Sequence, residues 1–512
     1  MTRPMTQALS THTVVAVIGA GAMGAGIAQV AASAGHTVKL LDSRPDAAAQ
    51  AIKGIQAQLE KMVAKGKMNP DAASAVGARL RVASHLADLA DAGLVIEAIV
   101  ENLPIKQALF AELENIVSAC CLLASNTSSI SITAIGATLK TPERLAGLHF
   151  FNPAPLMALV EVVSGLATDP AVAATLHATV TAWGKTAVHA KSTPGFIVNR
   201  VARPYYGEAL RLRGEGAGDC ATLDAVMREA GGFRMGPFEL MDMIGLDVNY
   251  AVTCSVWNAF FNDPRFSPSL QQQELVDAGF LGKKTGRGFY DYREGAEKPA
   301  PSTEAAQTVP NDIVICGDSA AAAALALRLS AAQVSFVRTP SVDTRVAQCG
   351  NAVLFVTDGR TATARAAHSG IANTVLIDLA LNYQQASRLA MSVAGQCDDA
   401  AAQATTGLLQ ATGLKVSRLA DVAGLAVMRT VAMLVNEAAD AVNQGVCSAA
   451  AADAAMRLGV NYPMGPLAWA DQVGLSHIRD VLIHLAASYA EDRYRLSPLI
   501  ARHVFLGKKL HD

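Results

Sequence analysis

Aromatic and charged residues are scarce in this chain: aromatics make up 5% of it, charged residues 17%, and tryptophan occurs only three times. The formal net charge is −2, so no basic excess is present to neutralise a polyanion, and nucleic acid is not an expected partner. The eight cysteines include no CxxC pair. We expect them to be reduced thiols of a cytoplasmic protein, and we expect no metal site.

One run without charge is long enough to cross a bilayer, residues 13–35, "TVVAVIGAGAMGAGIAQVAASAG". Its glycines argue against a membrane span, because Gly19, Gly21 and Gly24 form G-x-G-x-x-G between a strand-like run and a helical run. No membrane partner is therefore expected. The preceding "MTRPMTQALSTH" has no apolar segment of the kind found in secretion signals, and we expect it to be a disordered tail.

The sequence around these glycines predicts a dinucleotide site. A tight turn, a close approach of the backbone to a pyrophosphate and a helix N-terminus facing its charge all follow from that spacing. The next strand-like run, "HTVKLLD", ends in Asp42, whose carboxylate suits ribose hydroxyls and repels a 2′-phosphate. NAD is therefore favoured over NADP. The alternative is an apolar strand-turn-helix that binds nothing.

Residue composition and the spacing of apolar residues change four times along the chain, and these changes predict five segments. Strand-like runs such as "LVIEAIV", "CLLASNT" and "LAGLHFF" alternate with helical runs up to about residue 190, which is typical of a parallel sheet. The fold class expected is α/β plus all-α: a Rossmann-type NAD-binding domain, a helical domain, and a degenerate copy of both. The predicted segments are a sheet domain 13–192, a helical domain 193–292, a linker 293–311, a degenerate Rossmann-like domain 312–421 and a second helical domain 422–512.

The duplication holds without a gap at an offset of 229 residues in the helical parts. The motif "MGP" occurs at 235 and again at 464. The other identical pairs are Gly195 with Gly424, Arg200 with Arg429, Glu208 with Glu437, and Asp224 with Asp453. Chance does not keep that register.

Several motifs together resemble the L-3-hydroxyacyl-CoA dehydrogenases, in order and rough spacing, over about residues 13–292. They are "GAGAMGAGIAQVAA", "EAIVENL", "SNTSS", "GLHFFNP", "VEVV", "PGFIVNR", "MGPFELMD" and "GKKTGRGFY". The second helical domain makes the chain similar to long stand-alone bacterial members associated with 3-hydroxybutyryl-CoA or 3-hydroxyadipyl-CoA, the latter in phenylacetate breakdown. The resemblance implies NAD-dependent oxidation of an (S)-3-hydroxyacyl-CoA, as in β-oxidation of fatty acids.

Two residues suit the chemistry of that oxidation. A base must take the hydroxyl proton while hydride leaves the same carbon, and imidazole is the usual base near neutral pH. His149 ends a strand-like run, at the edge of the sheet where ligands of such folds bind. Glu161 lies in the apolar run "ALVEVV", where a carboxylate needs a partner, so we expect it to orient His149. The alternative is a core histidine without a catalytic role.

The remaining site residues are implied by the resemblance. Ser128 and Asn199 would contact the substrate oxygen, with Ser125 and Ser129 as neighbours that leave the serine assignment open. Turn-forming and helix-start roles are the alternatives for these two. The family's contacts to the nicotinamide and its ribose fall on four further positions: Glu101, Lys106, Asn152, and one of Lys283 and Lys284, of which we choose Lys284.

A basic face is expected to meet the phosphates of coenzyme A. Lys61 and Lys65 fall four residues apart in a predicted helix, and the resemblance favours Lys65. A solvated lysine face is the alternative.

The second half is predicted to lack cofactor-binding and catalytic groups. Its turn, "CGDSAA", keeps Gly317 but has Ser319 and Ala322 at the other glycine positions, and Arg338 follows where the acid should be. Met428 stands at the position of Asn199, and no counterpart of the histidine motif follows, so every chemical group is expected to be lost. We expect the second helical domain to pack on the first in cis as an internal partner, with a homodimer also open.

Two rival functions remain at this stage. One is a dehydrogenase of a free hydroxy acid or sugar acid, which would share the nucleotide fold. The other is a non-enzymatic binding or structural relative. The length of the acyl chain is not predicted, because one methylene in an apolar pocket changes binding by only about 1 to 3 kcal/mol.

Overall fold

The computed structural model describes residues 7–340 and 343–512, and it separates into two compact units. The first unit is Met1–Arg200 with Gln444–Val460, and the second unit is Val201–Asn443 with Asn461–Asp512. No described helix is both long enough and apolar enough to span a bilayer.

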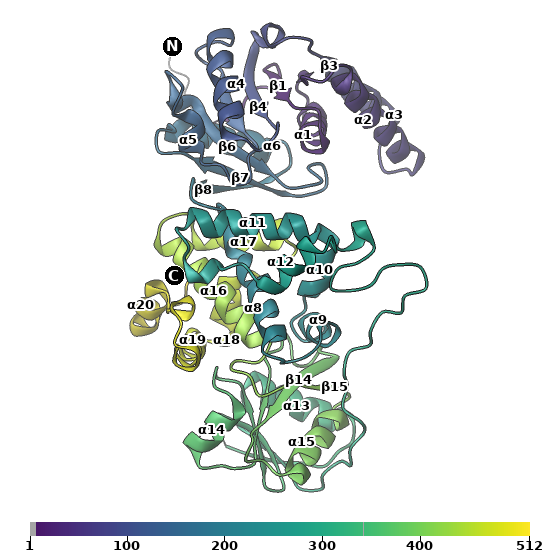
Figure 1. Ribbon diagram of the computed structural model, residues 1–512, viewed down its shortest axis with the longest axis vertical. Helices are drawn as coiled ribbons and strands as arrows, with labels where there is room; N and C mark the ends of the chain where they lie inside the picture. The colour runs from purple at the N-terminus through teal and green to yellow at the C-terminus, as the bar shows by residue number, and fades with distance from the viewer. Residues whose placement is uncertain (1–6, 341–342) are drawn as a thin grey trace. The chain divides into compact units, whose positions relative to one another are not determined.

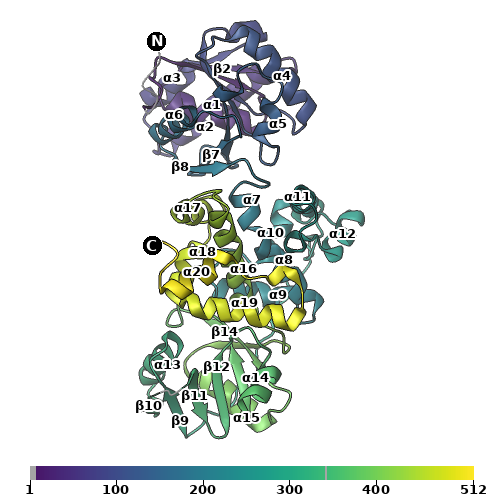
Figure 2. The ribbon, with the colours of Figure 1, turned by 90° about the vertical axis from the view of Figure 1, so that its left-hand side faces the viewer.

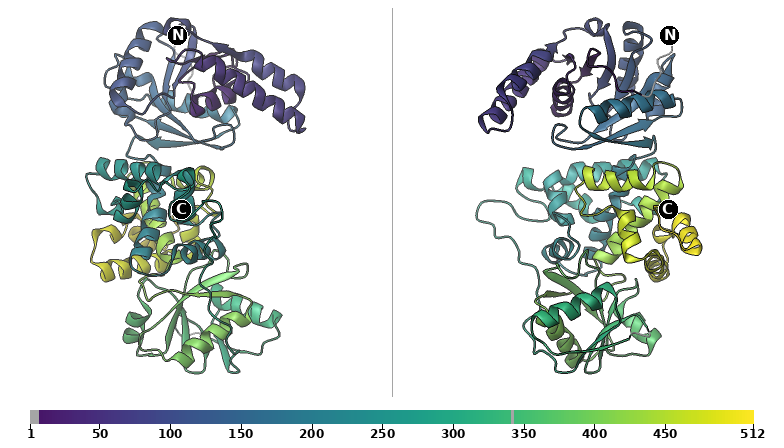
Figure 3. Two further views of the ribbon diagram at one scale, coloured as in Figure 1. Left: turned by 45° about the vertical axis from the view of Figure 1, so that its right-hand side comes forward. Right: turned by 180° about the vertical axis from the view of Figure 1, so that it is seen from behind.

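The first unit is an eight-stranded sheet covered by helices (Figure 1). The strands are β1 (Val14–Ile18), β2 (Val38–Leu41), β3 (Leu80–Val82), β4 (Ala92–Glu97), β5 (Leu122–Ser125), β6 (Leu145–Phe150), β7 (Leu159–Ser164) and β8 (Thr186–Lys191). The helices are α1 (Ala22–Ser33), α2 (Ala47–Ala64), α3 (Pro70–Arg79), α4 (Leu103–Ile116), α5 (Ile132–Gly136), α6 (Pro170–Ala182), α7 (Val198–Val201) and α17 (Ala449–Gly459), with short turns η1 (Leu86–Leu89) and η2 (Pro142–Arg144). Figure 3 shows α2 and α3 lying side by side as a pair at one end of the sheet.

The order of strands explains where a ligand can bind. The sheet runs β3-β2-β1-β4-β5-β6-β7-β8, and all neighbours are parallel except β6 and β7. The apolar strand β1 is almost fully buried, as expected of a parallel strand covered on both faces. Because the order reverses at β1, a crevice opens at its carboxyl end, where dinucleotides bind in such sheets.

One helix of the first unit comes from the second half of the sequence. Helix α17 packs on β7 and β8. At its end, Gly459 lies so close to Leu159 and Val198 that an added Cβ would be 2.8 and 3.0 Å from their side chains. The backbone N–H of Lys191 donates to the carbonyl of Val446 at 2.9 Å. The first sheet is therefore completed by a segment that follows it by about 250 residues.

The prediction of a disordered N-terminal tail is wrong at Leu9. Its side chain is 8% exposed, and its N–H donates to Oγ1 of Thr179 at 3.0 Å. A single apolar residue in a short polar stretch gave no signal of this packing. The part of the tail formed by residues 1–6 lies outside the described residues.

The second unit holds a smaller sheet and most of the helices (Figure 2). Its helices are α8 (Arg203–Gly214), α9 (Cys220–Glu229), α10 (Pro237–Ile244), α11 (Leu246–Ala259), α12 (Leu270–Asp277), α13 (Ala320–Ala331), α14 (Ala362–Ser369), α15 (Asp399–Ala411), α16 (Val427–Asn443), α18 (Pro466–Val473), α19 (Leu475–Tyr489) and α20 (Pro498–Leu506), with turns η3 (Pro264–Phe266), η4 (Lys283–Thr285) and η5 (Asp492–Tyr494). Its strands are β9 (Ile313–Cys316), β10 (Val337–Thr339), β11 (Arg345–Cys349), β12 (Ala352–Val356), β13 (Thr374–Ile377), β14 (Arg388–Val393) and β15 (Lys415–Arg418).

The second sheet is a reduced version of the first. Its order is β10-β9-β11-β12-β13-β14-β15, and β11 is antiparallel to both of its neighbours. The antiparallel step between β13 and β14 repeats the step between β6 and β7. The predicted linker precedes this sheet as a long loop without helix or strand (Figure 1). It runs along the second unit, since the N–H of Glu304 donates to Val416 at 2.8 Å.

The repeated glycine before each helical part adopts the same backbone in both halves. Gly195 has φ +73° and Gly424 has φ +78°, and the next residues, Phe196 and Leu425, have φ +48° and +54°. Left-handed backbone is strained for residues other than glycine, so two consecutive cases at matched positions mark a shared turn. The duplication read from the sequence is thus present in the backbone.

The motifs "MGPFELMD" and "GRGFYDY" hold the first helical domain together. Asp224 accepts hydrogen bonds from the N–H groups of Phe238 and Glu239 at 2.9 and 3.0 Å and from the Tyr290 hydroxyl at 2.6 Å. Asp242 accepts from the N–H groups of Phe289 and Tyr290 at 2.9 Å. Asp224 of α9 thus binds the start of α10, and Asp242 of the first motif fastens the loop that carries the second.

Candidate active site

The glycine turn after β1 leaves an open, uncapped helix N-terminus. A Cβ on Gly19 would lie 2.4 Å from the carbonyl of Ala98, and one on Gly24 would lie 1.8 Å from the carbonyl of Gly19, so both must be glycine. A Cβ on Gly21 would meet nothing within 4 Å. Gly21 caps α1 without a side-chain hydrogen bond, so this helix end fits the pyrophosphate of a dinucleotide.

Asp42 follows β2 and lies beside the glycine turn. Its Oδ2 accepts a hydrogen bond from the N–H of Ala20 at 2.7 Å. Arg44, which the sequence reading overlooked, donates from Nε to Oδ1 at 3.0 Å. The hydrogen bond from Arg44 lowers the pKa of Asp42 to about 2, with help from the Ala20 N–H. The carboxylate is therefore ionised at any physiological pH and can accept from ribose hydroxyls.

Lys106 and Glu101 belong to a buried ion network at the ends of β4 and β5. Lys106 is 1% exposed and donates to Glu97 at 2.6 Å, and its Nζ lies 3.3 Å from Glu101. Glu97 also accepts from the Ser125 hydroxyl at 2.6 Å. Glu101 accepts from Oγ1 of Thr127 at 2.6 Å, and this bond together with the Lys106 charge lowers the pKa of Glu101 although burial opposes it. Lys106 thus holds the two carboxylates in place.

His149 and Glu161 form the expected pair. They are directly opposite each other in the antiparallel register of β6 and β7, and Nδ1 of His149 lies 2.6 Å from Oε2 of Glu161. Glu161 is fully buried, and its Oε1 accepts from the N–H groups of Ile197 and Val198, each at 3.0 Å. One carboxylate therefore orients the imidazole and anchors the start of α7. With Nδ1 directed at an acceptor, Nε2 is left as the basic nitrogen.

Ser128 and Asn199 are brought together beside this pair. The Asn199 side chain donates to the carbonyl of Ser128 at 3.3 Å, and Asn199 follows the Val198 N–H that Glu161 binds. The N–H of Ser128 donates to Glu101 at 3.0 Å. The four proposed catalytic residues and the Glu101 network therefore form one continuous polar site in the first unit.

Asn152 and Asn126 lie at the end of β6. Asn152 is exposed just after that strand. Asn126, which the sequence reading did not single out, accepts from the N–H of Phe150 at 2.8 Å and fixes the strand end next to His149. The amide that follows a buried strand in "ASNTSS" was the available signal.

The other three predicted lysines are at the surface. Lys61 lies in the last turn of α2 and Lys65 caps its end, and both are exposed. Lys284 belongs to the second unit, where its Nζ donates to Asp247 at 2.6 Å. Their contacts with coenzyme A and with NAD stay predictions.

The second half closes its turn with a side chain. Ser319, at the position of Gly21, accepts from the N–H of Ala322 at 3.3 Å and so occupies its own helix N-terminus. Arg338 binds the exposed Asp318 at 2.7 Å rather than presenting a carboxylate. The helix N-terminus that is open to an anion in the first turn is therefore already hydrogen-bonded by a side chain in the second.

The second half keeps one anchoring carboxylate, Asp378, where the first half has its histidine. This residue is 229 positions after His149, and its carboxylate accepts from the N–H groups of Ala426, Val427 and Met428 at 2.8 to 2.9 Å. Burial raises the pKa of Asp378 to about 6. The anchoring function of Glu161 is thus retained, moved from β7 to the strand opposite, while the imidazole is gone.

Comparison with known proteins agrees with this geometry. Residues 14–193 match the family described as "3-hydroxyacyl-CoA dehydrogenase, NAD binding domain". Residues 195–292 and 424–510 match its "C-terminal domain", and 354–422 match the "3-hydroxybutyryl-CoA dehydrogenase reduced Rossmann-fold domain". The chain is 45% identical over 492 residues to the "3-hydroxyadipyl-CoA dehydrogenase" of Escherichia coli (strain K12), covering 96% of this chain and 97% of that protein.

This chain belongs to the 3-hydroxyacyl-CoA dehydrogenase family. A crystal structure of a "3-hydroxybutyryl-CoA dehydrogenase" from Escherichia coli K12 is similar along the whole chain, with a TM-score of 0.88 and 45% identity over 97% of this chain and 99% of that one. The "Probable 3-hydroxybutyryl-CoA dehydrogenase" of Bacillus subtilis is 41% identical over 55% of this chain and 97% of its own length. A short member therefore corresponds to about half of this chain, and the reduced fold with the second helical part is the addition.

Proposed function

We propose that the protein oxidises an (S)-3-hydroxyacyl-CoA to the 3-oxoacyl-CoA with NAD. The observation that carries this is the pair of His149 and Glu161, joined at 2.6 Å beside Ser128 and Asn199 in a family of this activity. The rival oxidation of a free hydroxy acid lacks support from the relatives, all of whose quoted names specify acyl-CoA substrates.

Residues of this chain account for the proton transfer. Nε2 of His149 takes the proton of the 3-hydroxyl, and Glu161 stabilises the imidazolium that results. Ser128 and Asn199 hold the substrate oxygen within reach of Nε2. Bound NAD supplies the acceptor for the hydride that leaves C3. Gly19, Gly21, Gly24 and Asp42 would hold its pyrophosphate and ribose, and Glu101 and Asn152 its nicotinamide end.

The test of this function is the reverse reaction. We expect the purified chain to oxidise NADH in the presence of acetoacetyl-CoA and to leave NADH untouched in the presence of acetoacetate. Equal rates with thioester and free acid would support a free hydroxy-acid dehydrogenase, and no turnover with either would support a non-enzymatic relative. Rates with 3-hydroxybutyryl-CoA and 3-hydroxyadipyl-CoA then decide the acyl chain, on which the two quoted Escherichia coli names differ.

We propose further that the second half acts as an internal partner for the first. The support lies within the second unit, where α16 packs against α8. The fully buried Arg429 of α16 donates to Glu208 of α8 at 2.8 Å. Arg265, which follows α11, likewise donates to Glu437 of α16 at 3.0 Å. The equivalent glutamates of the two halves are thus each bound by an arginine of the other half, as expected where related surfaces pack on each other.

A further inference from the structure

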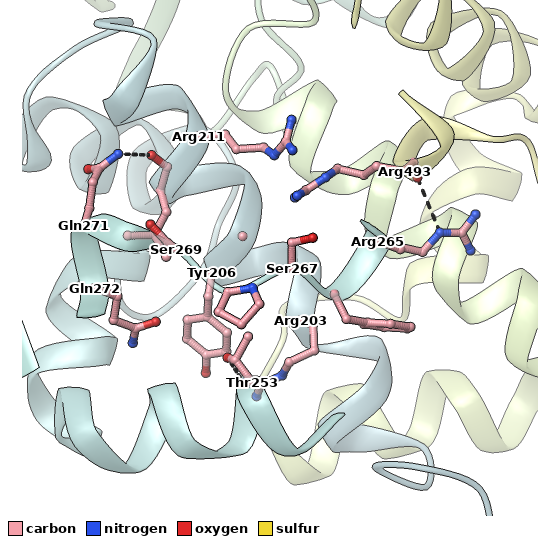
Figure 4. Close-up of a pocket in the computed structure, with 14 residues that line it drawn as sticks. Arg203, Tyr206, Arg211, Thr253, Arg265, Ser267, Ser269, Gln271, Gln272 and Arg493 are labelled. Atoms are coloured by element: carbon pink, nitrogen blue, oxygen red, sulfur yellow. Dashed lines mark hydrogen bonds between the residues drawn. The ribbon is translucent and has the colours of Figure 1, made fainter. Parts of the chain in front are cut away.

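A pocket of about 300 Å³ in the second unit is lined by arginine side chains (Figure 4). It lies between α8, α11, the turn η3 and the turn η5. Four arginines line it: Arg203, Arg211, Arg265 and Arg493. None of the 14 residues that form its wall, all in the described part of the chain, is acidic.

The duplication provides an internal comparison for these arginines. Arg265 of η3 reaches α16 in the second half, where its guanidinium donates to Glu437 at 3.0 Å and to Asp440. Arg265 is 4% exposed and Glu437 1%. A buried cation is thus matched by two carboxylates one helical turn apart.

The corresponding place on α8 lacks one of those carboxylates. At the offset of 229 residues, Glu208 stands for Glu437, but Arg211 stands for Asp440. Glu208 is already bound by Arg429 at 2.8 Å and by the Tyr494 hydroxyl at 2.9 Å. The arginine of η5 that reaches this place on α8 therefore lies near Arg211. Its equivalent in the first half, Arg265, lies near Asp440 instead.

This arginine of η5 is Arg493. It is 5% exposed, and its Nε makes no hydrogen bond with any described residue. Burial lowers the pKa of Arg493, and the charge of Arg211 lowers it further while Glu208 opposes the shift. Figure 4 shows the guanidinium groups of Arg211 and Arg493 directed toward each other. They share one carboxylate, Glu491, which lies 2.7 Å from Arg211 and 3.6 Å from Arg493.

The pocket has room where the second half has a side chain. Asn436 on α16 fills this position, donating to the carbonyl of Arg495 at 2.9 Å and accepting from the N–H of Ser497 at 2.8 Å. Its counterpart on α8 is Gly207, and a Cβ there would meet only Nη1 of Arg493, at 3.9 Å. Where α16 has the amide of Asn436 and the carboxylate of Asp440, α8 therefore has a cavity at Gly207 and the guanidinium of Arg211.

We propose that this pocket binds a small anion whose carboxylate or phosphate oxygens fill the place that Asp440 fills in the other half. Planar guanidinium groups pair with both anions in a bidentate manner, and such bonds are strong where water is excluded. Ser267, Ser269 and Gln271 add polar groups to the wall. The site goes beyond the proposed oxidation and does not depend on it. The anion is a free small molecule that carries a carboxylate or a phosphate.

Calorimetric titration of the full-length protein tests the site, with inorganic phosphate and adipate as probes against chloride at constant ionic strength. We expect at least one probe to bind with a single site per chain. Arg211→Asp restores the carboxylate of the other half and should weaken that binding at least tenfold. Gly207→Asn fills the cavity as Asn436 does and should have the same effect if the first variant is unstable. Arg338→Gln, at an exposed arginine outside the pocket, should bind as the wild type does.

Two results overturn the proposal: neither probe binds more tightly than chloride, or Arg211→Asp and Gly207→Asn both bind it as the wild type does. The titration needs no turnover, so failure of the proposed activity leaves it interpretable.

Discussion

His149 and Glu161 face each other across two antiparallel strands, with Nδ1 of the imidazole 2.6 Å from Oε2 of the carboxylate. The second oxygen of Glu161 accepts from the N–H groups of Ile197 and Val198 at the start of α7. The next residue along the chain is Asn199, whose side-chain amide donates to the carbonyl of Ser128. One buried carboxylate therefore sets the imidazole and Asn199 in a fixed relation.

Replacing His149 with Gln should remove the base. We expect kcat to fall by about 10² to 10⁴, the usual contribution of a general base, with the Kd for NADH nearly unchanged. His189→Gln is the matched control, because His189 is an exposed histidine on β8 stacked on His177. Turnover near the wild-type value in the His149 variant would remove this residue from its proposed role.

Replacing Glu161 with Gln should disturb the orientation of the His149 imidazole without unfolding the protein. The amide oxygen can still accept from the two N–H groups, but the amide NH₂ would face Nδ1 and turn the imidazole into the tautomer whose Nε2 carries the proton. We expect kcat to fall by about 10² to 10⁴ while the melting temperature changes by only a few degrees. Loss of folding together with activity, or retention of both, would contradict this account. Circular dichroism and steady-state rates measure the two quantities.

Asp42 and Arg44 should decide between NAD and NADP. The wild type is expected to prefer NAD strongly, since an ionised carboxylate opposes a 2′-phosphate. Asp42→Ser removes that charge and releases Arg44, which now bonds the carboxylate at 3.0 Å. The preference for NAD in kcat/KM should then fall by roughly 10²-fold, since unfavourable juxtaposition of like charges costs several kcal/mol. Adding Arg44→Gln should reverse the gain with NADP; an equal gain without Arg44 would contradict its role.

Motifs with a local meaning could be predicted from the sequence. Gly19 and Gly24 leave no room for a Cβ and Gly21 leaves open space, so their spacing encodes the turn directly. Glu161 was predicted to need a partner because a carboxylate in an apolar strand is costly. Its register with His149 could not be read, since a loop of unspecified shape joins the two strands.

Contacts between distant parts of the chain could not be predicted. Lys106 on α4 meets Glu97 at the end of β4 only after the helix has packed on the sheet. Asp378 could not be predicted because an aspartate at the position of His149 reveals its role only when the N–H groups of the next helix lie against it. Helix α17 packs on a sheet built from residues far earlier in the chain, which no local pattern records.

Asp378 should make stability depend on pH. Its pKa is raised from 3.8 to about 6 by complete burial, so between those values the native state keeps a proton that the unfolded state has lost. The free energy of unfolding therefore falls as pH rises from about 4 to about 6, by up to about 3 kcal/mol from this group. Asp378→Asn cannot ionise, so its melting temperature should rise relative to that of the wild type as pH increases over that range.

A matched control isolates this effect. Asp291 is partly exposed, and its hydrogen bond from Arg293 lowers its pKa to about 2. Asp291→Asn should therefore differ from the wild type by a constant amount between pH 4 and pH 7. The melting temperature of each variant is followed by scanning calorimetry at several pH values. A constant difference for Asp378→Asn as well would show that its carboxyl does not titrate in this range.

A chain that ends at Tyr292 should fail to behave as a short family member. It loses α17, which packs on β7, and α16, which packs on α8. The apolar faces left on β7 and α8 would then be exposed, so we expect aggregation or a new dimer and a loss of turnover. Supplying residues 293–512 as a separate fragment should restore both properties. Light scattering and turnover decide the matter: a truncated chain with the full-length protein's subunit number, solubility and activity would contradict an internal partner.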